Sequence, residues 1–144
     1  MIATWVVVAD EAIARFLEVP DDGGDLREVD QITDAAAHAD RADLRRDAYG
    51  RRGSTVTSSA GEDELHKEAD LFARRVAERL AEAQQKHRYD ELRVVAAPRF
   101  LGYLRKALPK QVSDAVVDEV DKDLVQLDMR SLTQHLFPPG GAAY

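Results

Sequence analysis

The run from Ile2 to Ala9 is apolar almost throughout, and it limits the possible folds more than any other stretch of the chain. Such a run is typical of a strand that is buried on both faces. We therefore expect a β-sheet with this strand at its centre. The run is far shorter than the roughly 20 residues of a membrane helix, and no basic segment precedes it as in a secretory signal. A cytoplasmic location without membrane attachment is the expectation.

The length of 144 residues suits a single domain with its own core, which we expect over residues 1–144. Hydrophobic residues make up 44% and charged residues 33% of the chain, which argues against a disordered tail and against a membrane protein. There is no cysteine, so disulfides, thiolate metal sites and cysteine nucleophiles are excluded.

Further apolar segments predict the rest of the sheet. Residues 12–19 follow the first strand after a short polar turn, which indicates an antiparallel hairpin. Residues 26–33 predict a weaker strand at an edge, and residues 91–97 predict another buried strand. Residues 116–127 fit both a helix, by the spacing of their apolar residues, and a strand, by their alternation. We expect a strand after about Ala115, because the preceding helical segment can serve as a crossover.

Three helical segments complete the pattern. Residues 62–87 carry apolar side chains at steps of three and four, which places them on one helical face. Residues 100–108 predict a short helix, and residues 110–115 predict a further helical turn. Asp128 is a suitable cap for a last helix that ends near Leu136, and residues 138–144 resemble a frayed tail.

The expected fold is therefore a single α/β domain with a mixed β-sheet in the order β-β-β-α-β-α-β-α and helices packed on it. One segment does not fit this plan. Residues 34–61 show no sustained period and are rich in Ala, Asp and Arg, then in Gly, Ser and Thr. We predict a long, flexible loop there, and a loop of that length inside a compact domain is often functional.

The formal net charge is −7, which argues against sequence-independent coating of nucleic acid. The charge is unevenly distributed, however. Residues 41–53 carry a net charge of +3 and residues 99–111 a net charge of +4, so −14 remains on the rest of the chain (−7 minus 7). Binding of RNA, if it occurs, is expected at these two segments alone.

Arginines on a flexible backbone can grip phosphate oxygens, and Tyr49 can stack on an unpaired base. The other interpretation of the same residues is a solvated loop whose arginines pair with the protein's own carboxylates. The candidate RNA-binding residues are Arg45, Arg46, Tyr49, Gly50, Arg51, Arg52, Gly53, Ser54, Arg99, Arg105 and Lys106.

The sequence signals for metal binding and for catalysis are weaker. Asp121 and Asp123 lie on one face if their segment is a strand, and with Asp10 they could bind Mg²⁺ for phosphodiester cleavage. The four histidines form no zinc motif, and His66 is expected on the surface of the long helix. No nucleophile elbow or phosphate-binding loop is present, so we assign no catalytic residue, no resident metal and no cofactor.

Four stretches of the sequence resemble the host attachment protein family. They are T-W-V-V-V-A-D near the start, F-A-R-R-V-A-E-R-L in the long helix, A-A-P-R-F-L-G-Y-L-R, and E-V-D-K-D-L, and the likeness extends over about residues 3–137. The family name implies a role in bacterial attachment to a host. Its fold is thought to be similar to the middle domain of archaeal and eukaryotic class-1 peptide-chain release factors, which has a strand meander, a glycine-rich loop and a long helix.

The release-factor loop carries a Gly-Gly-Gln tripeptide, and Arg52-Gly53-Ser54 stands at the comparable place here. The resemblance therefore implies docking to RNA or to the ribosome rather than peptidyl-tRNA hydrolysis, because the Gly pair and the amide side chain are both absent. A protein-interaction or regulatory module that affects attachment indirectly is the first alternative. A metal-dependent phosphodiester hydrolase is the second.

Overall fold

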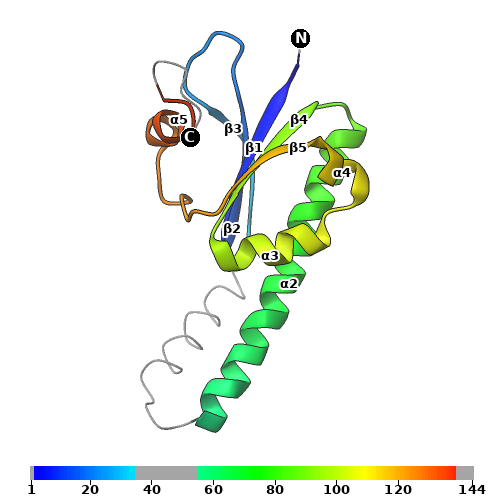
Figure 1. The fold of residues 1–144 in the computed structure, drawn as a ribbon, viewed down its shortest axis with the longest axis vertical. Helices are drawn as coiled ribbons and strands as arrows, with labels where there is room; N and C mark the ends of the chain where they lie inside the picture. The colour runs from blue at the N-terminus through cyan, green and yellow to red at the C-terminus, as the bar shows by residue number, and fades with distance from the viewer. Residues whose placement is uncertain (1, 35–54, 139–144) are drawn as a thin grey trace.

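A computed structural model describes residues 2–34 and 55–138, with side chains described for residues 2–34 and 66–138. The described residues form five strands and four helices (Figure 1). The elements in chain order are β1 (Thr4–Ala9), β2 (Ile13–Glu18), β3 (Arg27–Thr33), α2 (Thr55–Gln85), β4 (Glu91–Ala96), α3 (Pro98–Ala107), α4 (Lys110–Ala115), β5 (Val116–Val120) and α5 (Met129–Leu136).

The five strands form one mixed sheet in the order β3-β2-β1-β4-β5. Strand β1 pairs antiparallel with β2 and parallel with β4, so it lies at the centre, and β3 lies at an edge. Both positions confirm the sequence predictions. Strand β5 pairs parallel with β4, which confirms the strand after Ala115, but it ends at Val120, so residues 121–127 are not part of it.

The central strand is buried on both faces, as its apolar run predicts. Trp5 and Val7 belong to a core cluster that also contains residues of α2, α3 and α4. Val6 and Val8 belong to a second cluster on the other face, with residues of α5. Successive side chains of a strand point to opposite faces, and the sheet is therefore a middle layer between two helical layers (Figure 1).

Helix α2 is longer than the sequence predicts. It begins at Thr55 instead of Glu62, so residues 55–61 are helical and not part of the predicted loop. Thr, Ser and Gly are weak helix formers, which hides this start in the sequence, whereas each residue added to a formed helix gains a hydrogen bond. The rest of the predicted loop, residues 35–54, lies outside the described residues, as do residues 139–144 of the predicted tail.

The C-terminal end of α2 is closed by a turn at His87, which has a positive φ of 57°. The N–H of His87 donates to the carbonyl of Gln84 at 2.9 Å, and the N–H of Arg88 donates to that of Ala83 at 3.0 Å. This pair of bonds is the Schellman arrangement, which reverses the chain direction after a helix. The turn leads Arg88 and Tyr89 back to the start of β4.

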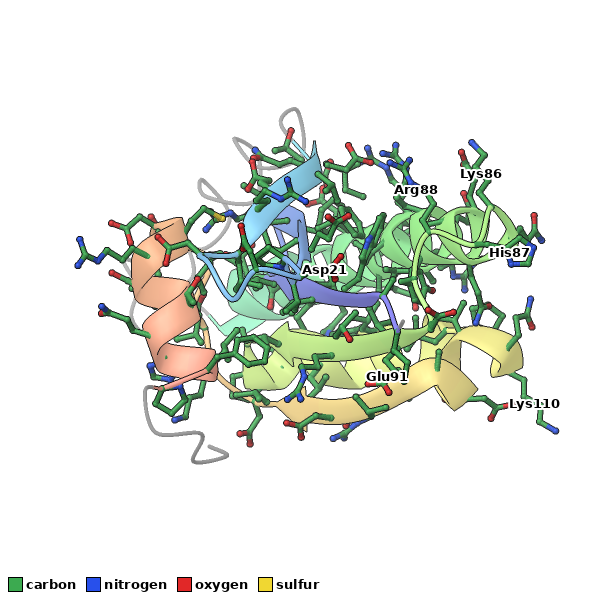
Figure 2. All side chains as sticks on the ribbon, turned by 90° about the horizontal axis from the view of Figure 1, so that it is seen from above. Asp21, Lys86, His87, Arg88, Glu91 and Lys110 are labelled. Carbon is green, nitrogen blue, oxygen red and sulfur yellow. The ribbon has the colours of Figure 1, made fainter. Side chains whose placement is uncertain are left out.

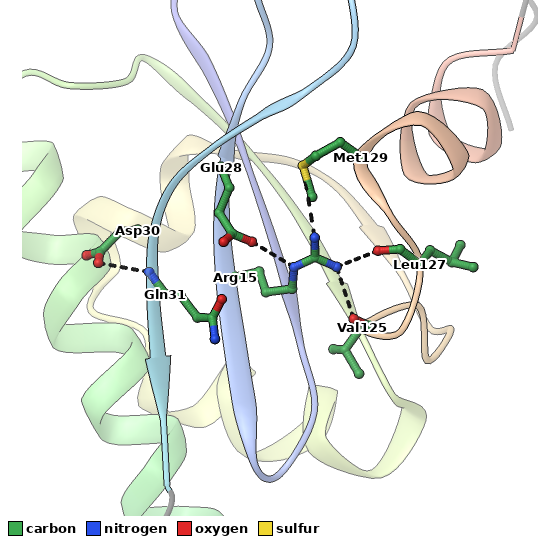
Figure 3. Close-up of polar contacts among 7 residues, drawn as sticks. All are labelled: Arg15, Glu28, Asp30, Gln31, Val125, Leu127 and Met129. Carbon is green, nitrogen blue, oxygen red and sulfur yellow. Dashed lines mark hydrogen bonds and ion pairs between the residues drawn. The ribbon is translucent and has the colours of Figure 1, made fainter.

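Arg15 joins the sheet to the segment between β5 and α5 (Figure 3). Its guanidinium donates to the carbonyl oxygens of Val125 at 3.0 Å and Leu127 at 2.6 Å, and it pairs with Glu28 at 2.8 Å. The sequence shows this arginine only as an interruption of an apolar strand. Asp128 caps α5 as predicted, because its Oδ1 accepts from the N–H of Ser131 at 2.7 Å.

Tyr89 is expected to make the free energy of unfolding decrease at alkaline pH. Its side chain is buried, its hydroxyl donates to the carbonyl of Leu80 at 2.8 Å, and burial raises its pKa from 10.0 to about 12. The folded state therefore holds the phenol proton more tightly than the unfolded state does, so this contribution to stability is intact below pH 10 and is lost as the pH rises toward about 12. Urea unfolding across this range should show a shallower alkaline decline for Tyr89→Phe than for the unchanged protein. Parallel declines of the two proteins would contradict the assignment.

Candidate functional site

The carboxyl ends of β1 and β4 meet at one edge of the sheet. Ala9 is opposite Ala96 in the parallel register, and the N–H of Ala97 donates to the carbonyl of Ala9 at 3.2 Å. Helix α3 begins immediately afterwards at Pro98, a residue that suits the first turn because its missing N–H has no partner there in any case. In open α/β sheets, this edge is the usual place for a ligand.

Four polar side chains gather at this edge, and we call them the His66 cluster. Glu11 follows β1, His66 comes from α2, and Arg99 and Tyr103 come from α3, where they are one helical turn apart. His66 and Arg99 are exposed, whereas Glu11 and Tyr103 are half-buried. The four side chains lie together around Ala69, with no space between them for a water molecule.

The hydrogen bonds of His66 define its tautomer. Its Nε2 lies 3.1 Å from Nη2 of Arg99, and its Nδ1 bonds the hydroxyl of Tyr103. A guanidinium can only donate, so Nε2 must accept and the hydrogen of the neutral ring must be on Nδ1, which donates to the Tyr103 oxygen. The imidazole thereby orients Arg99 without neutralising its charge.

The three basic residues predicted on residues 99–111 do not form one surface. Arg105 is paired with Glu119 of β5, with an Nη2–Oε1 distance of 2.6 Å, and its hydrogen bond to Glu119 raises the pKa of Arg105. Arg99 and Lys106 instead lie seven positions apart, on the helical face of Tyr103. Arg99 and Lys106 therefore share a face of α3, whereas Glu119 compensates the charge of Arg105, and RNA binding by this segment stays a prediction.

The other predicted site residues lie outside the described residues, but the elements that flank them are described. Asp34 donates its backbone N–H to the carbonyl of Ala12, one residue after Glu11. On the other side the chain resumes with α2 at Thr55, about 16 Å along the helix from His66 at 1.5 Å per residue. The described chain thus stops at Asp34, next to Ala12, and resumes at Thr55 on the helix that carries His66. The arginine-rich segment between these two residues in the sequence contains Arg45, Arg46, Tyr49, Gly50, Arg51, Arg52, Gly53 and Ser54.

The carboxylates considered for metal binding have other surroundings. Asp10 Oδ1 accepts from the N–H groups of Ala12 and Ile13 at 2.8 and 2.9 Å, so it stabilises the hairpin turn. Asp121 and Asp123 are exposed in the segment after β5. Within residues 2–34 and 66–138, whose side chains are described, no group of three or more His, Asp or Glu side chains is placed to hold a metal ion.

Sequence reasoning missed the participation of His66, Tyr103 and Glu11. It placed His66 correctly on the surface of the long helix, but His66 and Tyr103 are 37 positions apart. The one local signal was the spacing of four between Arg99 and Tyr103, which puts both on one face of a short helix. That spacing does not indicate that α2, with His66, packs against this face of α3.

The fold and this edge define a class of protein: a three-layer α/β domain with a mixed five-stranded sheet and a polar cluster at the carboxyl edge of its parallel strands. The chain belongs to the family of proteins required for attachment to host cells, whose family model matches residues 5–136. The resemblance to this family is thereby confirmed. A search of the curated proteins finds no match to the chain. Among the described residues, no helix is both long and apolar enough to cross a membrane.

Proposed function

We propose that this protein is a non-enzymatic RNA- or ribosome-binding module with a fold similar to the middle domain of class-1 release factors. The proposal rests chiefly on Arg99. This exposed arginine lies in the first turn of α3, where no acidic residue occurs. A phosphate at this position would contact Arg99, and we propose that arginines of residues 41–53 also contribute to binding.

The charge of Arg99 is available to a ligand. Its hydrogen-bond partner is a neutral imidazole, and it forms no ion pair with a described carboxylate. Arg105 on the same helix differs, because Glu119 compensates its charge. A guanidinium that is oriented but not neutralised is well suited to donate two parallel hydrogen bonds to a phosphate.

The net charge of −7 supports binding at one place instead of over the whole surface. Residues 41–53 contribute five arginines with a net charge of +3. The described residue that precedes this part of the chain, Asp34, donates its backbone N–H to the carbonyl of Ala12, next to Glu11 of the His66 cluster. Phosphate contacts from this segment and from Arg99 would displace counterions, so the affinity for RNA should fall with salt.

Arg99→Ala should weaken binding of single-stranded RNA about 5-fold at low salt, because one phosphate contact is lost. The slope of log K against log salt should also fall by about 0.7. A fluorescence-anisotropy titration at several salt concentrations measures both quantities. Arg105→Ala is the matched control on the same helix and should change the affinity less than about 2-fold, because its charge is already paired.

The double variant Arg51→Ala, Arg52→Ala tests the arginine-rich segment. It should weaken RNA binding more than Arg99→Ala does. The proposal is wrong if the unchanged protein binds neither RNA nor ribosomes at low salt. It is also wrong if neither the Arg99 variant nor the double variant differs from the unchanged protein.

The alternative of a protein-interaction module has less support. The large apolar side chains exposed in the described part of the chain are Ile2, Leu71 and Val117, and they come from different elements. Single exposed apolar residues are normal on protein surfaces and do not mark an interface. A pull-down that recovers signalling or surface proteins without RNA or ribosomal components would favour this alternative.

A further inference from the structure

A hollow with a volume of about 200 Å³ lies at the opposite end of β1 from the His66 cluster. Its walls come from three elements and the turn after α2: Trp5 of β1, Asp30 of β3, Arg79 and Glu82 of α2, and Lys86 and Arg88 beyond it. Figure 2 shows Lys86 and Arg88 projecting on the same side of the molecule from the end of α2.

Both carboxylates of the hollow are already paired. Asp30 forms an ion pair with Arg79, and Glu82 accepts from Lys86 Nζ at 3.0 Å. The hydrogen bond from Lys86 also lowers the pKa of Glu82, so this carboxylate is ionised. These two pairs leave one lining cation, Arg88, without an ion pair to any described residue.

Arg88 lies over the ring of Trp5, with its guanidinium carbon 5.7 Å from the ring centre. The Schellman turn at His87 holds it there. Trp5 is 3% exposed, and its indole N–H is buried with no acceptor among the described residues. A buried donor without an acceptor costs free energy, about 1–3 kcal/mol as a general figure, and few native donors are left in this state.

Arg88 is thus the donor of the hollow without an ion pair to a described residue, and the uncompensated charge of the lining is positive. A ligand must therefore supply acceptor atoms and negative charge. The volume equals that of about six or seven water molecules at ~30 Å³ each, below the usual range for drug-sized ligands. We propose that this hollow is a binding site for a small oxyanion, carboxylate or phosphate, which pairs with the guanidinium of Arg88 where it lies over the Trp5 ring. The site is separate from the edge proposed for RNA and does not depend on that proposal.

Trp5 is the only tryptophan in the chain, so its fluorescence reports directly on the hollow. The full-length protein is titrated with sodium phosphate and, separately, with sodium malonate, with sodium chloride added to keep the ionic strength constant. We expect a saturable change in emission with at least one anion, at a concentration in the millimolar range or below. Tighter binding of phosphate would identify a phosphate group as the natural ligand chemistry, and tighter binding of malonate a carboxylate.

Two variants test the proposed anion site by isothermal titration calorimetry, a measurement that does not depend on the fluorescence of Trp5. Arg88→Ala should raise the dissociation constant about tenfold, because the anion loses its charge partner. Trp5→Phe keeps an aromatic ring beneath the guanidinium and should change the dissociation constant less than Arg88→Ala does. Arg130→Ala removes an exposed arginine of α5, on the other face of the sheet, and should leave binding unchanged. The proposal is overturned if neither anion gives saturable binding, or if Arg130→Ala weakens binding as much as Arg88→Ala.

Discussion

Replacing Phe100 with alanine is expected to lower the free energy of unfolding by about 3–5 kcal/mol. Phe100 is fully buried in the core cluster between the sheet and helices α2 to α4. Its ring packs on that of Phe72, with the ring centres 5.9 Å apart. The substitution removes the apolar contacts and leaves a cavity that the surrounding close-packed side chains fill only in part.

This loss is a large fraction of the roughly 5–15 kcal/mol that stabilises a typical domain. Phe100 is also the residue after Arg99, so loosening of α3 should disturb the His66 cluster. Urea unfolding followed by circular dichroism measures the effect. Leu71→Ala is the matched control: Leu71 precedes Phe72 in the chain but is 52% exposed, so its truncation should change stability by no more than about 0.5 kcal/mol. Equal effects of the two substitutions would contradict the described core.

Replacing Arg15 with alanine is expected to lower the free energy of unfolding by about 3 kcal/mol. The side chain of Arg15 is only 12% exposed and donates to the carbonyls of Val125 and Leu127. Without the guanidinium, these carbonyls lose a charged donor at a site where water has limited access, and Glu28 loses its ion-pair partner. Arg15→Lys should recover part of the loss, since a single ammonium group cannot reproduce the planar fork of a guanidinium.

Arg27→Ala is the matched control for this substitution. Arg27 pairs with Glu18 at 2.6 Å, but its side chain is 67% exposed, so its removal should cost less than about 1 kcal/mol. Hydrogen exchange gives a second readout, because the amides of residues 121–128 should exchange faster in the Arg15 variant. If they exchange as slowly as in the unchanged protein, Arg15 does not hold this segment to the sheet.

The strands could be predicted because their signals are local. The apolar run of β1 is continuous, and the turn after Ala9 separates it from β2 by few residues, so burial and hairpin pairing both follow from neighbouring positions. The cap at Asp128 is equally local, since its acceptor and donor are three positions apart. The start of α2 was missed because Ser, Thr and Gly weaken the helical signal where the helix itself continues.

The candidate sites could be predicted only in part. Arg99 was found through the local charge of its segment, but its partner His66 lies 33 positions earlier. The same local charge included Arg105, whose pairing with Glu119 depends on how β5 lies against α3. Trp5 lies in the apolar run that predicts a buried strand, and nothing near it in the sequence indicates that Arg88 lies over its ring.

The sequence by itself determined the mixed α/β class, the central place of β1 and the uneven distribution of charge, because period, turn and composition depend on residues within a few positions of one another. Only the tertiary structure decided which arginines have a guanidinium group that is not paired with a carboxylate of the described chain and can therefore bind a ligand. Arg15 reaches Val125 across 110 positions, Arg105 pairs with Glu119, and Arg88 has no carboxylate partner among the described residues. The physical reason is that an ion pair forms between side chains that packing brings within about 4 Å, and packing depends on the whole sheet and its helices at once.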